Sequence, residues 1–159
     1  GTEEGRGLQQ ILSGLELGRI NVAARGVGLA KAALDDSIEY SKIRKTFGKP
    51  ISNHQSIQIK LAEMATDIKT ARAIMLDAAT RKDANQPCLL EAAMAKLQAS
   101  QMAERVCSMA LQIHGGYGYL KDYIVEQLSR DIRATTIYEG TSEIQKMIIA
   151  KQLQELTLV

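Results

Sequence analysis

Three polar segments that contain glycine, at residues 44–55, 112–118 and 138–143, hold the side chains best suited to chemistry in this chain. They interrupt long stretches in which apolar residues recur at helical spacing. Polar residues gathered at the ends of helices favour a shared task at one surface. On the residues alone, ordinary turn formation is the commoner explanation for each segment, because glycine and small polar residues are frequent in turns.

Glu139 has the clearest chemical potential among these residues. It precedes Gly140 and the first turn of a predicted helix, where backbone N–H groups and the helix dipole stabilise a carboxylate. A substrate closing over this carboxylate would exclude water, and desolvation makes a carboxylate a stronger base. The pattern predicts a base that abstracts a proton. The alternative is an exposed residue near a helix start.

Other kinds of catalytic site have no matching pattern. The two histidines, His54 and His114, are far apart in sequence, and neither belongs to the E-x-x-H pairs that ligate metals in helical bundles. A G-x-S-x-G nucleophile elbow, a phosphate-binding loop of the Walker type and a dinucleotide-binding G-x-G-x-x-G after a strand are also missing. The sequence therefore predicts no metal site.

Long helices are predicted to position the three segments. Apolar residues recur at helical spacing over residues 8–43, 53–82 and 88–113. A shorter helix is predicted over 123–134, and a last helix follows Gly140. Because the connections between the long helices are short, consecutive helices should be antiparallel. The predicted fold class is all-α, an antiparallel up-and-down helical bundle of about five helices.

Local signals set the predicted breaks between these helices. Gly48 and Pro50 should end the first helix, and Ser52 with Gln55 three residues later resembles a capping box for the second. Pro87 is predicted to occupy the first turn of the third helix, because proline lacks the N–H that this position leaves unused.

Composition narrows the class of protein. The 159 residues are few enough for a single domain, residues 1–159, and 20 Lys and Arg against 18 Asp and Glu give a net charge of only +2, which argues against a nucleic-acid partner. No run approaches the roughly 20 apolar residues of a membrane span. Cys88 and Cys107 are expected to be packed thiols in a reducing compartment.

Several motifs in order along the chain resemble the acyl-CoA dehydrogenase family. The most specific are R-K-T-F-G at 44–48, Q-I-H-G-G-Y-G at 112–118 and Y-E-G-T-S at 138–142, and L-G-R-I at 17–20 supports them. The resemblance covers nearly the whole chain. It implies the C-terminal helical domain of a larger flavoenzyme, whose N-terminal helical and middle β domains are absent from this sequence, and a homo-oligomer, either a tetramer or a dimer.

The resemblance also implies roles for residues near the substrate. Glu139 matches the catalytic base that removes the α-proton of an acyl thioester, and its backbone N–H would polarise the thioester carbonyl. Tyr138 and Gly140 would line the path of the acyl chain. The stretch from Glu16 to Arg19 matches a segment that contacts acyl-CoA. Some relatives place the base just before this arginine, where the present chain has Gly18, which supports Glu139 as the base.

Further matching positions touch FAD in the family. They are Arg44, Thr46, Phe47 and Gln55 in the first segment, Gln112, Gly115 and Gly116 in the second, and Thr141 and Glu143 in the third. The arginine fork suits the pyrophosphate of the cofactor. The second group would meet the FAD of a neighbouring subunit. His114 is expected to be a packed histidine.

The implied activity is oxidation of acyl-CoA to trans-2-enoyl-CoA, with electrons passing from FAD to an electron-transfer flavoprotein, in a bacterial cytoplasm or a mitochondrial matrix. Two alternatives stay open: an acyl-CoA oxidase-like relative and a non-catalytic helical oligomerisation module. The intact Glu139-Gly140-Thr141 with Arg44 argues against the second. The chain by itself is expected to retain little FAD and to be inactive.

Overall fold

A computed structural model describes residues 4–157 of the chain. This part contains five α-helices: α1 (Gly7–Ile43), α2 (Gln55–Asp83), α3 (Leu89–His114), α4 (Ile124–Arg133) and α5 (Ser142–Thr157). Short 3₁₀ segments precede α2, follow α3 and follow α4, at Ile51–Asn53, Gly115–Tyr119 and Ala134–Thr136. The predicted all-α class is confirmed. Each predicted helix boundary lies within two residues of the observed one, and only the last helix had no predicted final residue.

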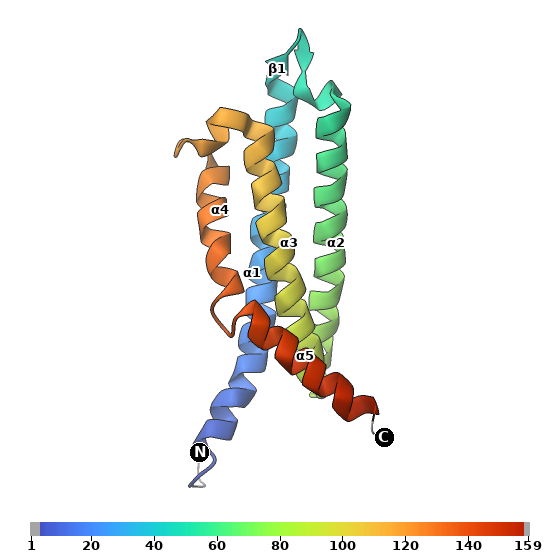
Figure 1. The fold of residues 1–159 in the computed structure, drawn as a ribbon, viewed down its shortest axis with the longest axis vertical. Coiled ribbons are helices and arrows are strands. Elements are labelled where there is room, and N and C mark those ends of the chain that lie inside the picture. The colour runs from blue at the N-terminus through green and yellow to red at the C-terminus, as the bar shows by residue number, and fades with distance from the viewer. Residues whose placement is uncertain (1–3, 158–159) are drawn as a thin grey trace.

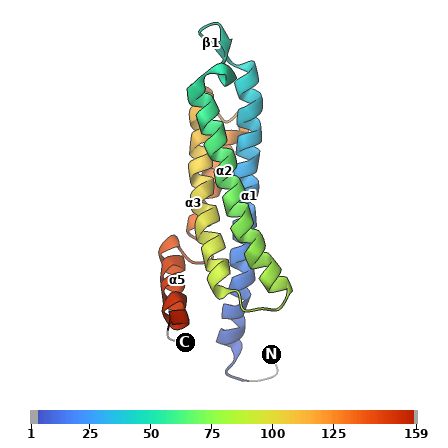
Figure 2. The ribbon, with the colours of Figure 1, turned by 90° about the vertical axis from the view of Figure 1, so that its right-hand side faces the viewer.

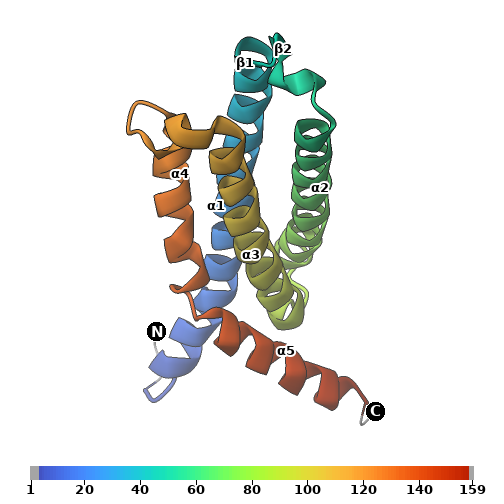
Figure 3. The same ribbon diagram turned by 45° about the horizontal axis from the view of Figure 1, so that its top comes forward.

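The first four helices run alternately up and down, as Figure 1 shows. Helix α3 lies at the centre and contacts each of the other four α-helices. Helix α5 differs from the others: it lies beside the lower part of α3 (Figure 2) and runs obliquely to the bundle (Figures 1 and 3). The up-and-down pattern therefore holds for α1 to α4, and α5 lies across it.

Small residues explain why α3 can occupy the centre. Ala92, Ala95, Ala99 and Ala103 are fully buried along it. A Cβ built on Gly26 of α1 would lie 3.1 Å from the carbonyl oxygen of Ala99, so the two backbones approach closely at this point. Such close contact requires residues without bulky side chains.

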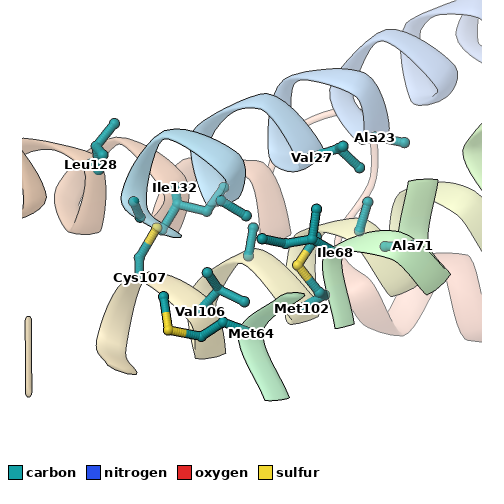
Figure 4. Close-up of a cluster of buried hydrophobic side chains, with 14 of the residues drawn as sticks. Ala23, Val27, Met64, Ile68, Ala71, Met102, Val106, Cys107, Leu128 and Ile132 are labelled. Atoms are coloured by element: carbon teal, nitrogen blue, oxygen red, sulfur yellow. The ribbon is translucent and has the colours of Figure 1, made fainter. Parts of the chain in front are cut away.

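Larger side chains fill the remaining core between α1, α2, α3 and α4 (Figure 4). Met64 and Ile68 of α2 pack near Met102 and Val106 of α3, and Ile132 of α4 closes the other side. Burying side chains of this size contributes roughly 1.5–3 kcal/mol each. This core fixes the axial register of the helices, and through it the positions of the polar segments.

A small hairpin after α1 was not predicted. Strand β1 (Lys45–Thr46) pairs antiparallel with β2 (Lys49–Pro50), with Thr46 opposite Lys49. The two residues of its turn, Phe47 and Gly48, have φ values of 49° and 79°. Type I′ turns require positive φ at both central positions, and a bulky residue adopts it only with strain. The hairpin therefore uses strained backbone to present Phe47 at its tip.

Two local predictions about helix starts are wrong. The capping box fails because α2 begins at Gln55 with His54 at its N-cap, and the backbone carbonyl of Ser52 instead accepts a hydrogen bond from the side-chain Nε2 of Gln58. Pro87 is outside α3, whose N-cap is Cys88, so it precedes the first turn. In both cases the helix begins later than the local signal indicated. No helix among the described residues is long and apolar enough to cross a membrane.

Candidate active site

The carboxylate of Glu139, in the connection between α4 and α5, lies against Gly18 of α1. A Cβ built on Gly18 would lie 2.6 Å from Oε2 and 3.1 Å from Oε1 of Glu139. Only glycine leaves room for the carboxylate in this position. The Glu139 side chain is half-buried and is directed at the bundle, so it is not the exposed residue of the alternative interpretation.

The backbone at Glu139 has an unusual conformation. Glu139 has a φ of 56° and Gly140 a φ of 90°, both in the left-handed region. For a residue with a side chain this costs energy, and such conformations persist where the surroundings hold them. The local structure therefore suggests a site whose geometry is imposed by its neighbours.

Two buried side chains hold this backbone. Lys96 of α3 donates from Nζ to the Gly140 carbonyl at 2.7 Å, and Nε2 of Gln145 in α5 lies 3.0 Å from the same oxygen. The Gln145 amide also lies 3.1 Å from the Glu139 carbonyl. Both side chains are fully buried. Sequence reasoning missed both residues, although a lysine among apolar helix positions was a possible signal.

A second buried cation, Arg19, completes the cluster. Its side chain is 6% exposed, and its Nε and Nη1 have no hydrogen-bond partner among residues 4–157. Burial lowers the pKa of Arg19, while the carboxylates of Glu16 and Glu139 oppose that shift. Burial also lowers the pKa of Lys96, and Arg19 adds to the effect. Two desolvated cations therefore lie close enough to Glu139 to interact with it electrostatically.

Glu16 is nearby but is already paired. Its Oε2 accepts hydrogen bonds from Lys82 Nζ at 2.9 Å and from the Cys88 thiol at 3.6 Å. The hydrogen bond from Lys82 to Glu16 raises the pKa of Lys82, and burial raises the pKa of Cys88. In this structure Glu16 ties the end of α2 and the start of α3 to α1.

The other predicted residues of this segment surround Glu139. The hydroxyl of Tyr138 is buried and has no hydrogen-bond partner within the described part of the chain. The Ile144 N–H lies 3.4 Å from Thr141 Oγ1 at the start of α5. Hydrogen bonds from its own backbone N–H and from the Thr141 side chain lower the pKa of Glu143. These groups stabilise the start of α5 directly after the base.

The first two polar segments meet at the upper end of the bundle (Figure 3). There they line a pocket of about 400 Å³, to which Arg44, Thr46, Gly115 and Gly116 contribute. The third segment is not at this pocket, because α4 separates the two regions along the bundle (Figure 1). The prediction that all three segments share one surface is therefore wrong within a single chain.

The other predicted residues of the first two segments lie at different distances from this pocket. Phe47 is 96% exposed, and its ring makes an edge contact with His54 at 6.1 Å between centroids. Thr46 Oγ1 lies 3.0 Å from Nε2 of the same histidine. Gln55 and Gln112 are exposed and do not line the pocket.

His114 is a packed residue, as expected. Its ring is stacked on Tyr40 at 4.1 Å between centroids, and Nδ1 lies 2.9 Å from the Ala110 carbonyl. Because a carbonyl only accepts, Nδ1 is the donor in this contact. On the other side of the ring, Nε2 lies 3.1 Å from Asp36 Oδ2. The histidine thus forms the buried floor of the upper pocket.

Several known proteins are similar to this chain in sequence. The sequence model of one protein family, the acyl-CoA dehydrogenase C-terminal domain, matches residues 5–154. A probable acyl-CoA dehydrogenase of Bacillus subtilis is 55% identical over 93% of the chain and 39% of that protein. A 3-(aryl)acrylate reductase of Clostridium sporogenes is 46% identical over 95% of the chain and 40% of that protein.

A solved structure agrees with these matches. The butyryl-CoA dehydrogenase of Megasphaera elsdenii superposes with a TM-score of 0.94 at 47% identity, over 96% of this chain and 40% of that one. The chain therefore spans about 40% of the length of the relatives it matches. By its sequence and its fold, it belongs to the acyl-CoA dehydrogenase family and corresponds to the C-terminal domain of that family.

Proposed function

We propose that this chain supplies the catalytic base and part of the cofactor site of an FAD-dependent acyl-CoA dehydrogenase. One observation carries the proposal: the Glu139 carboxylate lies in a space that only Gly18 can provide, on backbone fixed by two buried donors. Preorganised groups of this kind are typical of catalytic sites.

In this function Glu139 removes a proton from Cα of an acyl thioester. The Cα–H bond breaks, the proton passes to the carboxylate, and the Glu139 N–H stabilises negative charge on the thioester oxygen. Bound FAD supplies the two-electron acceptor for the hydride that leaves Cβ. Tyr138 and Gly140 would border the acyl chain, and Glu16 and Arg19 would contact acyl-CoA from α1.

The upper pocket fits part of a flavin dinucleotide. Arg44 provides a cation suited to a pyrophosphate, and Thr46 provides a hydroxyl. A Cβ built on Gly115 or Gly116 would have no heavy atom of the described chain within 4 Å beyond its immediate neighbours, so a ligand can approach this backbone. Exposed Phe47 offers an aromatic face.

Further positions belong to the same cofactor proposal. Gln55 and Gln112 would contact the dinucleotide from outside the pocket, and Thr141 with Glu143 would face the flavin from the start of α5. Because α4 separates the two regions, one FAD near Glu139 and another at the upper pocket imply a neighbouring subunit. The proposal therefore includes a homo-oligomer, a tetramer or a dimer.

The proposal includes two partners. An acyl-CoA would be the substrate, and an electron-transfer flavoprotein would accept the electrons; a relative from Acetobacterium woodii, a subunit of a complex with such a flavoprotein, supports the second partner. The proposed location is the bacterial cytoplasm or the mitochondrial matrix, and relatives from Bacillus subtilis and from bovine mitochondria support both.

Replacing the base tests the proposal. In the full-length protein that contains this chain, Glu139→Gln should keep FAD bound and abolish bleaching of the flavin by acyl-CoA under anaerobic conditions. Glu63→Gln, a matched change at an exposed position of α2, should bleach normally. Normal bleaching in Glu139→Gln would show that Glu139 is not the catalytic base.

The reverse reaction is a second candidate. The relative from Clostridium sporogenes is a 3-(aryl)acrylate reductase, and one from Anaerotignum propionicum, 48% identical, is an acryloyl-CoA reductase. In that direction Glu139 would donate the proton to Cα. Oxidation of the reduced flavoprotein by 2-enoyl-CoA, compared with reduction of the oxidised form by acyl-CoA, distinguishes the two, and oxygen uptake identifies an oxidase.

A further inference from the structure

The buried ammonium of Lys96 lacks a role in the proposed reaction. Lys96 is fully buried on α3, and its hydrogen bond crosses to the carbonyl of Gly140 at 2.7 Å. Burying a charged group is costly, and an apolar side chain of similar shape often packs at least as well. Packing alone therefore does not explain a lysine here.

The position of the ammonium indicates what the charge achieves. Gly140 follows Glu139, whose φ of 56° is strained for a residue with a side chain. A short, charge-assisted hydrogen bond to the Gly140 carbonyl fixes the peptide between Gly140 and Thr141, and so opposes relaxation of the backbone directly after Glu139. The Gln145 amide adds hydrogen bonds to the carbonyls of both residues from a different helix. Side chains from two helices thus hold two consecutive peptides, Glu139–Gly140 through Gln145 and Gly140–Thr141 through both Gln145 and Lys96.

We propose that Lys96, together with Gln145, is a positioning residue that holds the backbone from Glu139 to Thr141, in which Glu139 and Gly140 are left-handed, and so keeps the base carboxylate over Gly18. This inference rests on the proposed function, because it explains how the base is oriented. Lys96 does not touch the carboxylate in the described hydrogen-bond network; it acts through the Gly140 carbonyl.

The test uses the full-length flavoprotein that contains this chain, with Lys96→Met as the variant. Methionine retains most of the apolar stem and removes the ammonium. Lys146→Met is the matched control, because Lys146 is exposed on α5 next to Gln145 and loses the same charge. Two quantities are measured: amide hydrogen exchange of residues 138–145, and kcat with KM for reduction of the flavin by acyl-CoA.

In Lys96→Met, exchange in residues 138–145 should accelerate by about 10-fold or more, because a charge-assisted hydrogen bond is lost. The value of kcat should fall about 100-fold, as expected for a displaced catalytic group, while KM changes by less than about 3-fold. FAD content and exchange in the rest of α3 should match the wild type. Lys146→Met should change none of these quantities.

Unchanged amide exchange in residues 138–145 of Lys96→Met would overturn the inference. Faster exchange along the whole of α3 together with loss of FAD would also overturn it, because this result is expected of a residue that only supports the fold. If Lys96→Met does not fold, Gln145→Leu decides, because the same localised acceleration is required of it. A wild type without flavin reduction by any acyl-CoA would instead refute the proposed function, since the exchange measurement needs no turnover.

Discussion

Adding one methyl group at Gly18 should separate catalysis from stability. The new Cβ of Gly18→Ala would lie 2.6 Å from Oε2 of Glu139 and 2.8 Å from its Cδ. An ordinary carbon–oxygen contact is about 3.4 Å, so the carboxylate must retreat by about 0.8 Å. A misplacement of about 1 Å can cost roughly 100-fold in rate, which corresponds to about 2.7 kcal/mol.

Folding should respond in the opposite direction. The clash involves the end of a flexible side chain, and alanine is favoured over glycine in a helix interior by about 1 kcal/mol. Thermal unfolding of the full-length Gly18→Ala variant should therefore occur at or slightly above the wild-type temperature. The rate of flavin reduction by acyl-CoA, followed by stopped-flow absorbance, should fall about 100-fold.

Gly28→Ala is the control for this experiment. Gly28 is exposed on the same helix, and no heavy atom of the described chain beyond its own helix backbone lies within 4 Å of a Cβ built on it. The Gly28→Ala variant should gain the same stability from its helix and keep the wild-type rate of flavin reduction. A rate for Gly18→Ala within about twofold of the wild type would refute the reasoning from carboxylate displacement.

Three further outcomes are expected. Gly26→Leu should lower the free energy of unfolding by about 1–3 kcal/mol in denaturant titrations, because a side chain there meets the Ala99 carbonyl, and an unchanged midpoint would contradict the close contact of α1 and α3. Burial raises the pKa of Cys107 to about 12, above the value near 9 of an exposed thiol. The difference in unfolding free energy between the wild type and Cys107→Ala should therefore be largest below pH 9 and shrink by about 1.4 kcal/mol per pH unit as pH rises toward 12, because the unfolded thiol ionises first. A difference that stays constant with pH would count against burial of the thiol. The chain purified alone should contain little or no FAD, because it supplies only one side of the cofactor site, and stoichiometric yellow flavin would show otherwise.

The order and type of the helices were predictable because the signals are local. Apolar spacing along 8–43, 53–82 and 88–113 reports one buried face per helix, and the observed helices follow it closely. The helix starts were less predictable. Ser52 and Pro87 have the right chemistry for caps, yet packing moved both starts by a few residues.

By itself the sequence determined the family, the all-α fold and the candidate base, since each depends on residues close together along the chain. Only the tertiary structure decided how the base is held. Gly18, Lys96 and Glu139 belong to three segments separated by more than 40 residues, and the packing of α1, α3 and α5 brings them together. The same packing placed the third polar segment away from the other two and paired Glu16 with Lys82. Contacts between distant segments depend on the register of whole helices, which a periodic pattern of apolar residues does not specify.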